Sequence, residues 1–516
     1  MPRRMTLLLV LACSSLSFAN DQSPADPAQA AAGAGAAVEG AAAAWRWWQP
    51  AARASQQAYE ARLSQTPRAD RLRALHDAVC AEPHPAGTDS DQRMIEKLAL
   101  TFAELGLQVE VQELRVYIPE SVSAAVTVQR WAGQQDAKPI ELALQERPVT
   151  GDTQTAHPQL GIGWNAYSAS GDVTAEVVYA NYGTKSDFDE LAKLGIDVRG
   201  KIVIARYGRS FRGFKARFAE AAGAVGLLLY TDPADSGYRR GQPYPVGGWC
   251  NATSIQRGSI KTLPYPGDPL TPFAVALDSA PRVDPKILAL PKIPVQPLGW
   301  GAANEILSRM QGTPAPAAWQ GALPHHYRIV GGDALRVRMQ VDQPRRLKQT
   351  ANVIGKIEGS QFPDEVVILG CHFDAWTFGA GDPHAGTILL YECARAFAEA
   401  AEAGMRPART ILFANWGAEE FGIIGSTEYC EANAFELREN AVAYINLDMA
   451  AMGLDFRASA APLLKSVISD AAAAVEHPSG QSVLEQWRGD AATPRFGNLG
   501  GGSDHVGFYC HLGIPS

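Results

Sequence analysis

Acidic residues and one histidine gather in the last third of the chain in a pattern that could bind metal ions. They directly follow three apolar runs or lie in the loop after the first run. Imidazole and carboxylate groups are compatible ligands for zinc, and a bridging carboxylate can hold two ions about 3.5 to 4 Å apart. The sequence therefore indicates a metal centre built from separate segments. The candidates are His372 and Asp374 after the first run, Asp382 in the loop, Glu419 and Glu420 after the second run, and Asp448 after the third.

The adjacent carboxylates Glu419 and Glu420 could divide two roles. One could bind a metal ion, while the other accepts a proton from the water that attacks a carbonyl and delivers it to the leaving amine. This chemistry is amide hydrolysis. The sequence contains no GxSxG elbow and no P-loop. Cys371 adjoins His372, but it ends an apolar run and is expected to be buried rather than nucleophilic.

Each candidate alone also has an ordinary structural explanation. A single histidine at a strand end is more often structural than a ligand, and paired glutamates are common on solvated surfaces. Asp382 precedes Pro383, so it could instead cap the start of a helix. These explanations do not account for acidic residues after three apolar runs in turn. The combined pattern therefore favours the metal centre.

Alternating strands and helices are expected to hold these residues. The apolar runs 365–371, 410–416 and 441–447 predict strands, and the amphipathic runs 386–403 and 426–438 predict helices between them. This rhythm is typical of a largely parallel sheet covered by helices on both faces. Ligands collect beyond the carboxyl ends of such strands, so the separate candidates should converge on one crevice.

The upstream sequence predicts further elements and an insertion. Apolar residues three or four apart around 71–75 and 93–100 predict helices, and alternation around 109–116 and 124–129 predicts strands. Glycine and proline become frequent from residue 157 to residue 342, which indicates an inserted domain. The insertion is expected to contain a strand at 201–205, a helix at 214–222 and a strand at 225–230.

Composition limits the classes of function. The 516 residues are 46% hydrophobic and 19% charged, which predicts roughly two to four domains with ordinary cores. The 46 Lys and Arg against 54 Asp and Glu give a net charge of −8, so no broad cationic surface is expected and nucleic acid is not an expected partner. No apolar run approaches the roughly 18 to 20 residues of a transmembrane helix.

The first residues resemble an export signal. A positively charged start, an apolar stretch and a small-x-small cleavage site predict a signal peptide at residues 1–19. Residues 20–44 are rich in Ala, Gly, Pro and Asp and predict a flexible spacer. We therefore expect an exported protein, periplasmic or extracellular. Lipid anchoring at Cys13 is the alternative, but Leu11 fits a lipoprotein box poorly.

Several motifs closely resemble the glutamate carboxypeptidase family of zinc exopeptidases, the prostate-specific membrane antigen-like branch of the transferrin receptor-like superfamily. The motifs stand in the right order at residues 82–88, 371–376, 381–383 and 416–428. The resemblance implies an α/β fold, with a zinc-exopeptidase-like, mostly parallel mixed sheet covered by helices and an inserted protease-associated β-rich domain. The implied divisions are the N-terminal part of the peptidase domain at 45–156, the inserted domain at 157–342 and the zinc peptidase domain at 343–516.

The resemblance implies a role for each candidate. Two zinc ions would be bound in the complete enzyme, although the second site lacks a ligand in this sequence, and a structural Ca²⁺ is a further possibility. The implied roles are His372 and Asp448 as ligands of one zinc, Glu420 as a ligand of the other, Asp382 as the bridge, Glu419 as the general base and Asp374 as the partner that orients His372.

Substrate and calcium residues are implied in the same way. Arg212, with Phe211 beside it, resembles an arginine that grips the terminal carboxylate of the substrate, and Arg457 resembles a second anion-binding arginine. Without the resemblance, both arginines would be read as members of surface salt bridges. The residues that resemble calcium ligands are Thr271, Glu428 and Glu431.

The sequence departs from the family pattern in the substrate and calcium regions. Ser259 and Ser503 stand where the family has asparagines that help to hold substrate, which argues against a preference for acidic dipeptides. Phe273 and Ala274 replace the region of a calcium-binding tyrosine. The sequence also ends before the family's last zinc-binding histidine and its C-terminal helical dimerisation domain. We do not expect His505 or His511 to replace that histidine.

These observations predict a zinc-dependent exopeptidase that removes C-terminal residues from small peptides. The alternatives are an aminopeptidase of the same superfamily and a non-catalytic, receptor-like or decayed homologue. The retained metal-ligand candidates argue against the non-catalytic alternative. A homodimer is expected only where the C-terminal helical domain is present.

Overall fold

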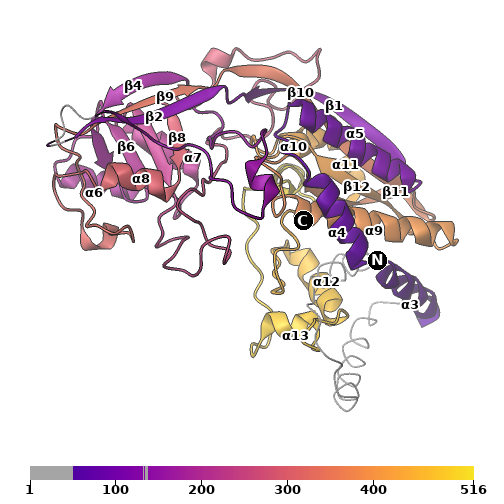
Figure 1. Cartoon of the computed structure of the whole chain (residues 1–516). Helices are drawn as coiled ribbons and strands as arrows, with labels where there is room; N and C mark the ends of the chain where they lie inside the picture. Colours follow the sequence, from indigo (N-terminus) through magenta and orange to yellow (C-terminus); the bar gives the residue numbers. More distant parts are fainter. Residues whose placement is uncertain (1–49, 132, 134–137) are drawn as a thin grey trace. The chain divides into compact units, whose positions relative to one another are not determined.

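The computed structural model describes residues 50–131, 133 and 138–516 (Figure 1). The predicted signal peptide, the spacer and Cys13 lie outside these residues. Within the described part, no helix is both long enough and apolar enough to cross a bilayer. The chain forms two compact units. The first unit comprises the described residues up to Arg115 together with Pro266–Pro281 and Gln349–Ser516, and the second comprises Val116–Tyr265 and Arg282–Lys348.

The first described elements of the first unit are three helices, namely α3 (Pro50–Gln65), α4 (Ala69–Val79) and α5 (Asp89–Glu104). The predicted helical periodicity around 71–75 and 93–100 is therefore confirmed. Helix α5 begins after Thr88, whose hydroxyl accepts a hydrogen bond from the backbone N–H of Asp91. Such a cap satisfies one of the amides that the first helical turn leaves unpaired.

A five-stranded mixed sheet with the order β1-β10-β12-β11-β13 forms the centre of the first unit. Strand β10 runs antiparallel to β12, whereas β12, β11 and β13 are mutually parallel. The carboxyl ends of these three parallel strands therefore meet at one edge of the sheet. The strands are β1 (Gln108–Pro119), β10 (Arg345–Ile357), β11 (Phe362–His372), β12 (Arg409–Trp416) and β13 (Ala441–Asn446).

Helices cover both faces of this sheet, as expected. On one face α9 (His384–Glu402) packs with α3, α4 and α5 around a core that includes Phe397 and Phe413. Helix α9 is buried along almost its whole length, which explains why its sequence is apolar on most sides. On the other face, Trp416 and Phe508 belong to a second core beneath α10 (Ile424–Ala432) and α11 (Ala434–Asn440). The remaining helices of the unit are α12 (Pro462–Ala473) and α13 (Val483–Arg488).

The single helix predicted at 426–438 is wrong, because two helices occupy this segment. Helix α10 ends at Ala432, and α11 begins at Ala434. Between them, Asn433 leaves the helical conformation with φ −118° and ψ 22°. Its side-chain amide donates to the Tyr429 carbonyl at 3.0 Å. Asparagine competes for local backbone groups in this way and so favours helix ends.

The second unit contains two four-stranded sheets, with the orders β3-β2-β9-β4 and β5-β6-β7-β8. The predicted strand, helix and strand correspond to β6, α7 and β7. The limits of this unit differ from the inserted domain expected at residues 157–342. Residues 116–156 belong to the second unit, and residues 266–281 belong to the first. The strands are β2 (Ser123–Arg130), β3 (Ile140–Glu141), β4 (Gly171–Ala175), β5 (Val177–Tyr179), β6 (Ile202–Arg206), β7 (Gly226–Tyr230), β8 (Val295–Leu298) and β9 (Arg336–Asp342), and the helices are α6 (Lys185–Lys193), α7 (Arg212–Ala221) and α8 (Trp300–Leu307).

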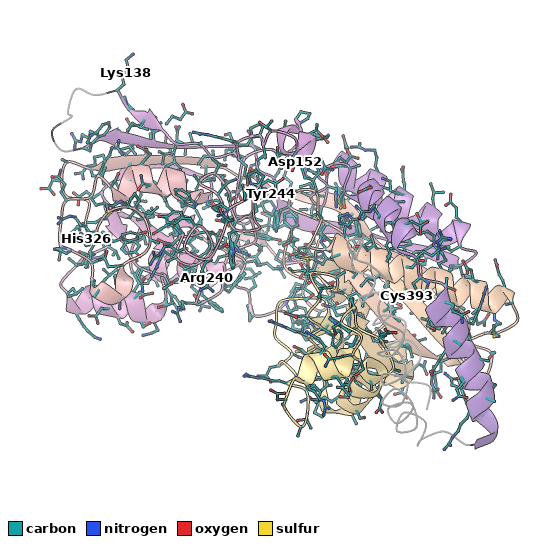
Figure 2. The ribbon with its side chains drawn as sticks, turned by 60° about the horizontal axis from the view of Figure 1, so that its bottom comes forward. Lys138, Asp152, Arg240, Tyr244, His326 and Cys393 are labelled. Carbon is teal, nitrogen blue, oxygen red and sulfur yellow. The ribbon has the colours of Figure 1, made fainter. Side chains whose placement is uncertain are left out.

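Side-chain hydrogen bonds tie distant segments of the second unit together. The Tyr244 hydroxyl donates to the carboxylate of Asp152, and both residues are labelled in Figure 2. The buried Lys215 on α7 donates to the backbone carbonyls of Tyr182 and Gly208. These bonds fix loops that follow the strands of the parallel sheet.

Candidate active site

The acidic edge of the sheet in the first unit is formed by three parallel strand ends. His372 is the last residue of β11, Glu419 lies three residues beyond the end of β12, and Asp448 lies two residues beyond the end of β13. Strand β11 lies between β12 and β13, so the histidine is central. The loop between β11 and α9 supplies Asp382. Side chains far apart in the sequence therefore meet at one point.

His372, Asp382 and Asp448 form the tightest group, with one potential ligand atom from each lying within 4.8 Å of the others. The Nε2 atom of His372 is 3.1 Å from Asp382 Oδ1 and 3.5 Å from Asp448 Oδ1. The nearest carboxylate oxygen of Glu419 is 3.9 Å from the same nitrogen. Among the described residues, Glu420 does not belong to this group of three.

One orphaned atom shows that the group fits a cation. Asp448 Oδ2 accepts a hydrogen bond from Ser503 Oγ at 2.7 Å, whereas Oδ1 is buried and makes no hydrogen bond. A buried carboxylate oxygen without a donor is costly unless a positive charge compensates it. The imidazole and two carboxylates are a donor set that zinc accepts. His372, Asp382 and Asp448 would therefore hold the ion.

Local hydrogen bonds prepare the His372 ring for this role. Its Nδ1 lies 3.1 Å from the backbone carbonyl of Asp374 and 3.6 Å from the carboxylate of the same residue. Because a carbonyl can only accept, we assign a proton to Nδ1, so Nε2 is the ring nitrogen that faces Asp382 and Asp448 and that would bind a metal ion in place of its own proton. Asp374 is the orienting partner that the sequence predicted, and of its two groups the carbonyl makes the closer contact with Nδ1.

The carboxylate of Asp374 instead fixes the turn that carries the two glutamates. It accepts hydrogen bonds from the backbone N–H groups of Glu419 at 2.8 Å and Glu420 at 3.2 Å. Asp374 is fully buried, so these charge-assisted bonds form away from water. The residue thus links the end of β11 to the loop after β12.

Replacing Asp374 by asparagine tests this link. The amide keeps the size of the carboxylate but removes its charge and one of its two acceptor oxygens, so the Glu419–Glu420 turn should loosen. We expect peptide hydrolysis or metal affinity to fall about 10- to 100-fold, as is usual for residues that support metal ligands. Steady-state kinetics and a competitive chelator titration would measure both. Unchanged values in Asp374→Asn would show that the two amide bonds do not position the turn.

Burial and mutual repulsion perturb the acids of the site. Burial raises the pKa of Glu419 well above its ordinary value despite the opposing effect of His372. Burial and the Asp382 carboxylate raise the pKa of Glu420 to about 8. Burial opposes protonation of His372, but the neighbouring carboxylates, Asp448 foremost, raise its pKa well above its usual range. A site that concentrates several acids around one imidazole is built to bind positive charge.

The backbone around the site adopts conformations that few residues tolerate. A Cβ atom on Gly386 would lie 1.9 Å from the carbonyl oxygen of Leu447, so only glycine lets the first turn of α9 approach the end of β13. Ala418 and Met449 have φ values of +56° and +53° directly beside Glu419 and Asp448. Positive φ is unfavourable for such residues and is often found at functional sites.

Two buried histidines that the sequence analysis did not single out lie next to the metal group. The Nε2 atoms of His84 and His384 are 2.8 Å apart, and both rings are fully buried. The backbone of His84 also bonds to the loop after β11. The His84 carbonyl accepts a hydrogen bond from Ala375 N–H, and the His84 N–H donates to the Thr377 carbonyl. His384 begins α9 two residues after Asp382. The pair therefore joins three segments next to the metal group.

The hydrogen bonds of this pair define its tautomers. His84 Nδ1 lies 2.7 Å from the Glu82 carbonyl, so we assign its proton to Nδ1 and make its Nε2 an acceptor. His384 must then donate from Nε2, which makes its Nδ1 an acceptor 3.2 Å from the Thr387 hydroxyl. The single proton of that hydroxyl is shared between this nitrogen and the His372 carbonyl, which is also 3.2 Å away. Burial lowers the pKa of both rings, in keeping with a neutral pair. In the sequence, the motif at residues 82–88, which resembles the family, is the one signal that includes His84.

A double-mutant cycle tests the histidine pair. His84→Ala and His384→Ala each leave the other Nε2 buried without its partner, so the two losses of unfolding free energy should not add. We expect a coupling energy of about 0.5–3 kcal/mol, measured by denaturant unfolding of the two single variants and the double variant in the presence of a chelator. Additive losses would show that the Nε2–Nε2 hydrogen bond contributes nothing.

The second unit carries the predicted carboxylate-binding residues Phe211 and Arg212 at the start of α7. The guanidinium of Arg212 packs against Gly258, where a Cβ atom would lie 2.2 Å from Nη1, and it contacts the Ser259 carbonyl at 3.4 Å. Phe211 is exposed, and its ring lies beside the guanidinium. Among the described residues, no carboxylate forms an ion pair with Arg212, unlike the surface salt bridge considered from sequence.

Arg457 lies in the first unit, on the wall of a cavity that Asp448 also lines. It is exposed and makes no ion pair with any described carboxylate. His505 lines the same cavity, but its Nε2 contacts the Gly500 carbonyl at 2.9 Å. Neither His505 nor His511 joins the three-residue metal group.

The predicted calcium residues lie elsewhere in the first unit. The two carboxylate oxygens of Glu428 accept hydrogen bonds from Asp268 N–H and Ala276 N–H, each at 2.7 Å. Thr271 donates its hydroxyl proton to Asp268 at 3.1 Å. These bonds anchor the segment 266–281 to α10, which places Glu428 in a structural role. Calcium binding by Thr271, Glu428 and Glu431 stays a prediction.

Comparison with known families agrees with this arrangement. Residues 352–516, which contain every member of the metal group, match peptidase family M28. Residues 173–263 match the PA domain. A peptidase M28 precursor from Shewanella amazonensis SB2B has a similar crystal structure, with a TM-score of 0.55 and 16% identity over 89% of this chain and 86% of that chain. This likeness concerns the fold.

Two curated relatives are more similar in sequence. The chain is 35% identical to the glutamate carboxypeptidase 2 homolog of Caenorhabditis elegans over 84% of its length, and 35% identical to aminopeptidase NAALADL1 of Mus musculus over 87%. The chain spans 59% and 63% of the lengths of these relatives, less than two thirds in each case. One relative is thus named a carboxypeptidase and the other an aminopeptidase.

Proposed function

Because residues 352–516 form a domain of peptidase family M28 and residues 173–263 form a PA domain, we propose that the chain is a zinc-dependent exopeptidase that cleaves small peptides. The observation that carries this proposal is the group of His372, Asp382 and Asp448, with the Glu419 carboxylate 3.9 Å from His372 Nε2. A donor set with a basic side chain beside it is what metal-assisted hydrolysis of an amide requires.

Each residue of the site has a definite task in this proposal. When bound, zinc supplies a Lewis acid that polarises the scissile carbonyl and makes water easier to deprotonate. Glu419 takes the proton of the attacking water and returns it to the leaving amine. Asp374 holds the Glu419 backbone, and Ser503 fixes one oxygen of Asp448. Glu420 and Asp382 are proposed to hold a second zinc ion.

We further propose that the enzyme removes residues from the C-terminus. Arg212 supports this choice, because a planar guanidinium without a carboxylate partner can bind a terminal carboxylate with two hydrogen bonds. An aminopeptidase would instead need acceptors for a free amine. The name of the mouse relative favours the aminopeptidase as the second candidate. Export to the periplasm or the extracellular space, and dimerisation through a C-terminal helical domain, stay predictions.

A matched set of peptides distinguishes the two activities. Arg212→Ala should raise KM about 10- to 100-fold for peptides with a free C-terminal carboxylate, because it removes charge-assisted hydrogen bonds worth about 1.5–3 kcal/mol. Peptides blocked at the N-terminus should remain substrates, and peptides amidated at the C-terminus should not. Arg209→Ala is the matched control, because Arg209 is an exposed arginine three residues before Arg212. Loss of cleavage on N-terminal blocking, with no effect of Arg212→Ala, would identify an aminopeptidase.

A further inference from the structure

A series of hydrogen bonds connects the core of the first unit to the metal group. The indole N–H of Trp416 donates to the Tyr444 hydroxyl at 3.0 Å, and that hydroxyl donates to Asn446 Oδ1 at 2.8 Å. Asn446 Nδ2 then donates to Ser503 Oγ at 2.8 Å, and Ser503 Oγ donates to Asp448 Oδ2 at 2.7 Å. Consecutive hydrogen bonds therefore join the fully buried Trp416 to a candidate zinc ligand.

The chemistry of these groups gives the protons a single direction. An indole N–H can only donate, so the Tyr444 oxygen accepts and its one proton goes to Asn446. We therefore assign the carbonyl oxygen of Asn446 to that side, which turns its NH₂ group toward Ser503. Ser503 accepts from this group and has its one proton left for Asp448. Burial raises the pKa of Tyr444 well above its ordinary value, so the phenol stays protonated and can donate.

Tight packing fixes the buried end of the series. Tyr444 stacks on Phe508 with ring centroids 4.0 Å apart and ring planes 6° apart, and both side chains are fully buried. A Cβ atom on Gly370 of β11 would lie 2.5 Å from Trp416 Nε1 and 2.5 Å from the Tyr444 hydroxyl oxygen. Glycine at this position thus leaves room for the hydrogen bond between Trp416 and Tyr444. Side chains packed in this way have little freedom to rotate and form a rigid anchor.

The series ends on the Asp448 oxygen that does not point to His372. Oδ2 receives the Ser503 proton, whereas Oδ1 is buried without a donor and lies 3.5 Å from His372 Nε2. The carboxylate cannot exchange its two oxygens without breaking the bond to Ser503. Hydrogen bonds of this kind hold a metal ligand in its binding orientation and so affect metal affinity.

Ser503 stands where the resembling family has an asparagine that helps to hold substrate. In this chain its hydroxyl accepts from Asn446 and gives its one proton to Asp448. A substrate could obtain that proton only if Asp448 lost it. These contacts assign Ser503 to the support of a metal ligand.

We propose that Trp416, Tyr444, Asn446 and Ser503 form a relay of positioning residues that holds the Asp448 carboxylate with Oδ1 toward the metal group. The proposal rests on the zinc-dependent function and adds the residues that orient one ligand. Because each link sets the proton of the next, losing a link at the buried end should loosen Asp448. Zinc affinity then depends on a tyrosine hydroxyl that is not itself a ligand.

Removing single links tests the relay on the full chain, with zinc affinity measured by competition with a chromophoric chelator. Tyr444→Phe removes only the hydroxyl group and should weaken zinc binding about tenfold. Ser503→Ala should weaken it about 10- to 100-fold, whereas Ser503→Thr keeps a hydroxyl group and should bind zinc nearly as tightly as the unaltered chain. Asn446→Ala breaks the relay at a half-buried position, where truncation disturbs the core least, and should also weaken zinc binding.

A second buried tyrosine of the first unit gives the matched control. The Tyr391 hydroxyl donates to the Leu98 carbonyl at 2.9 Å and accepts from Asn415 Nδ2 at 3.1 Å, and neither partner is a link of the relay. Tyr391→Phe makes the same chemical change in a similar environment, so it should lower stability in the same way but leave zinc affinity unchanged. Equal losses of zinc affinity in Tyr391→Phe and Tyr444→Phe would overturn the relay.

A double variant separates a relay from independent effects. In Tyr444→Phe/Ser503→Ala the bond to Asp448 is already absent, so zinc affinity should equal that of Ser503→Ala alone instead of falling by the product of the two losses. A multiplied loss, or unchanged affinity in Tyr444→Phe, would overturn the relay while leaving the exopeptidase intact. The predicted pattern of zinc affinities in a chain that cleaves no peptide would support the relay and contradict the proposed catalytic function.

Discussion

Replacing Glu419 by glutamine is expected to lower kcat about 10²- to 10⁴-fold, which is the usual contribution of a general base. The amide has nearly the shape of the carboxylate but cannot accept the proton of the attacking water. The Glu419 backbone would keep its hydrogen bond to Asp374, because that bond uses the main-chain N–H. Steady-state kinetics on a cleaved peptide would measure the loss.

The metal content of Glu419→Gln provides the control for this prediction. Glu419 lies outside the group formed by His372, Asp382 and Asp448, so the variant should bind as much zinc as the unaltered chain. Substrate affinity should also change little, because a general base acts on the transition state rather than on the bound peptide. Full activity in the variant, or loss of metal along with activity, would contradict the assignment of Glu419 as the proton acceptor.

His372→Ala is expected to have the second large effect, through metal binding. His372 is the central member of the group and the only imidazole in it. Its loss should weaken zinc binding by more than the 10- to 100-fold that outer supporting residues contribute, and activity should fall in parallel. Competition with a chromophoric chelator would measure the affinity.

An exposed histidine in the second unit gives the matched control. His326 is labelled in Figure 2 and belongs to the second compact unit. His326→Ala makes the same chemical change without touching the metal group, so zinc affinity and activity should match those of the unaltered chain. Equal effects of His372→Ala and His326→Ala would mean that the zinc ion binds elsewhere.

The arrangement of the metal group could be expected from the sequence because one topological rule governs it. Parallel strands covered on both faces read as continuous apolar runs, so the ends of β11, β12 and β13 are visible in the sequence. The rule that ligands gather beyond such ends then brings His372, Glu419 and Asp448 together. The sheet and its helical layers agree with that expectation.

Other features depend on contacts that no local pattern reveals. His84 and His384 are 300 residues apart, and each alone resembles an ordinary core histidine. The role of the Asp374 carboxylate depends on two backbone N–H groups of a loop 45 residues away. The break at Asn433 arises because a side chain competes with the helical hydrogen bond, which amphipathic periodicity does not detect. Tertiary packing decides each of these outcomes.

The most direct test of the account is to locate zinc in the protein. Crystals of the full chain grown with zinc and measured at the zinc absorption edge should give an anomalous peak about 2.0–2.2 Å from His372 Nε2 and from carboxylate oxygens of Asp382 and Asp448. A peak there would establish the group at the ends of β11 and β13 as the metal centre. An empty group with zinc bound at other residues would contradict the central claim.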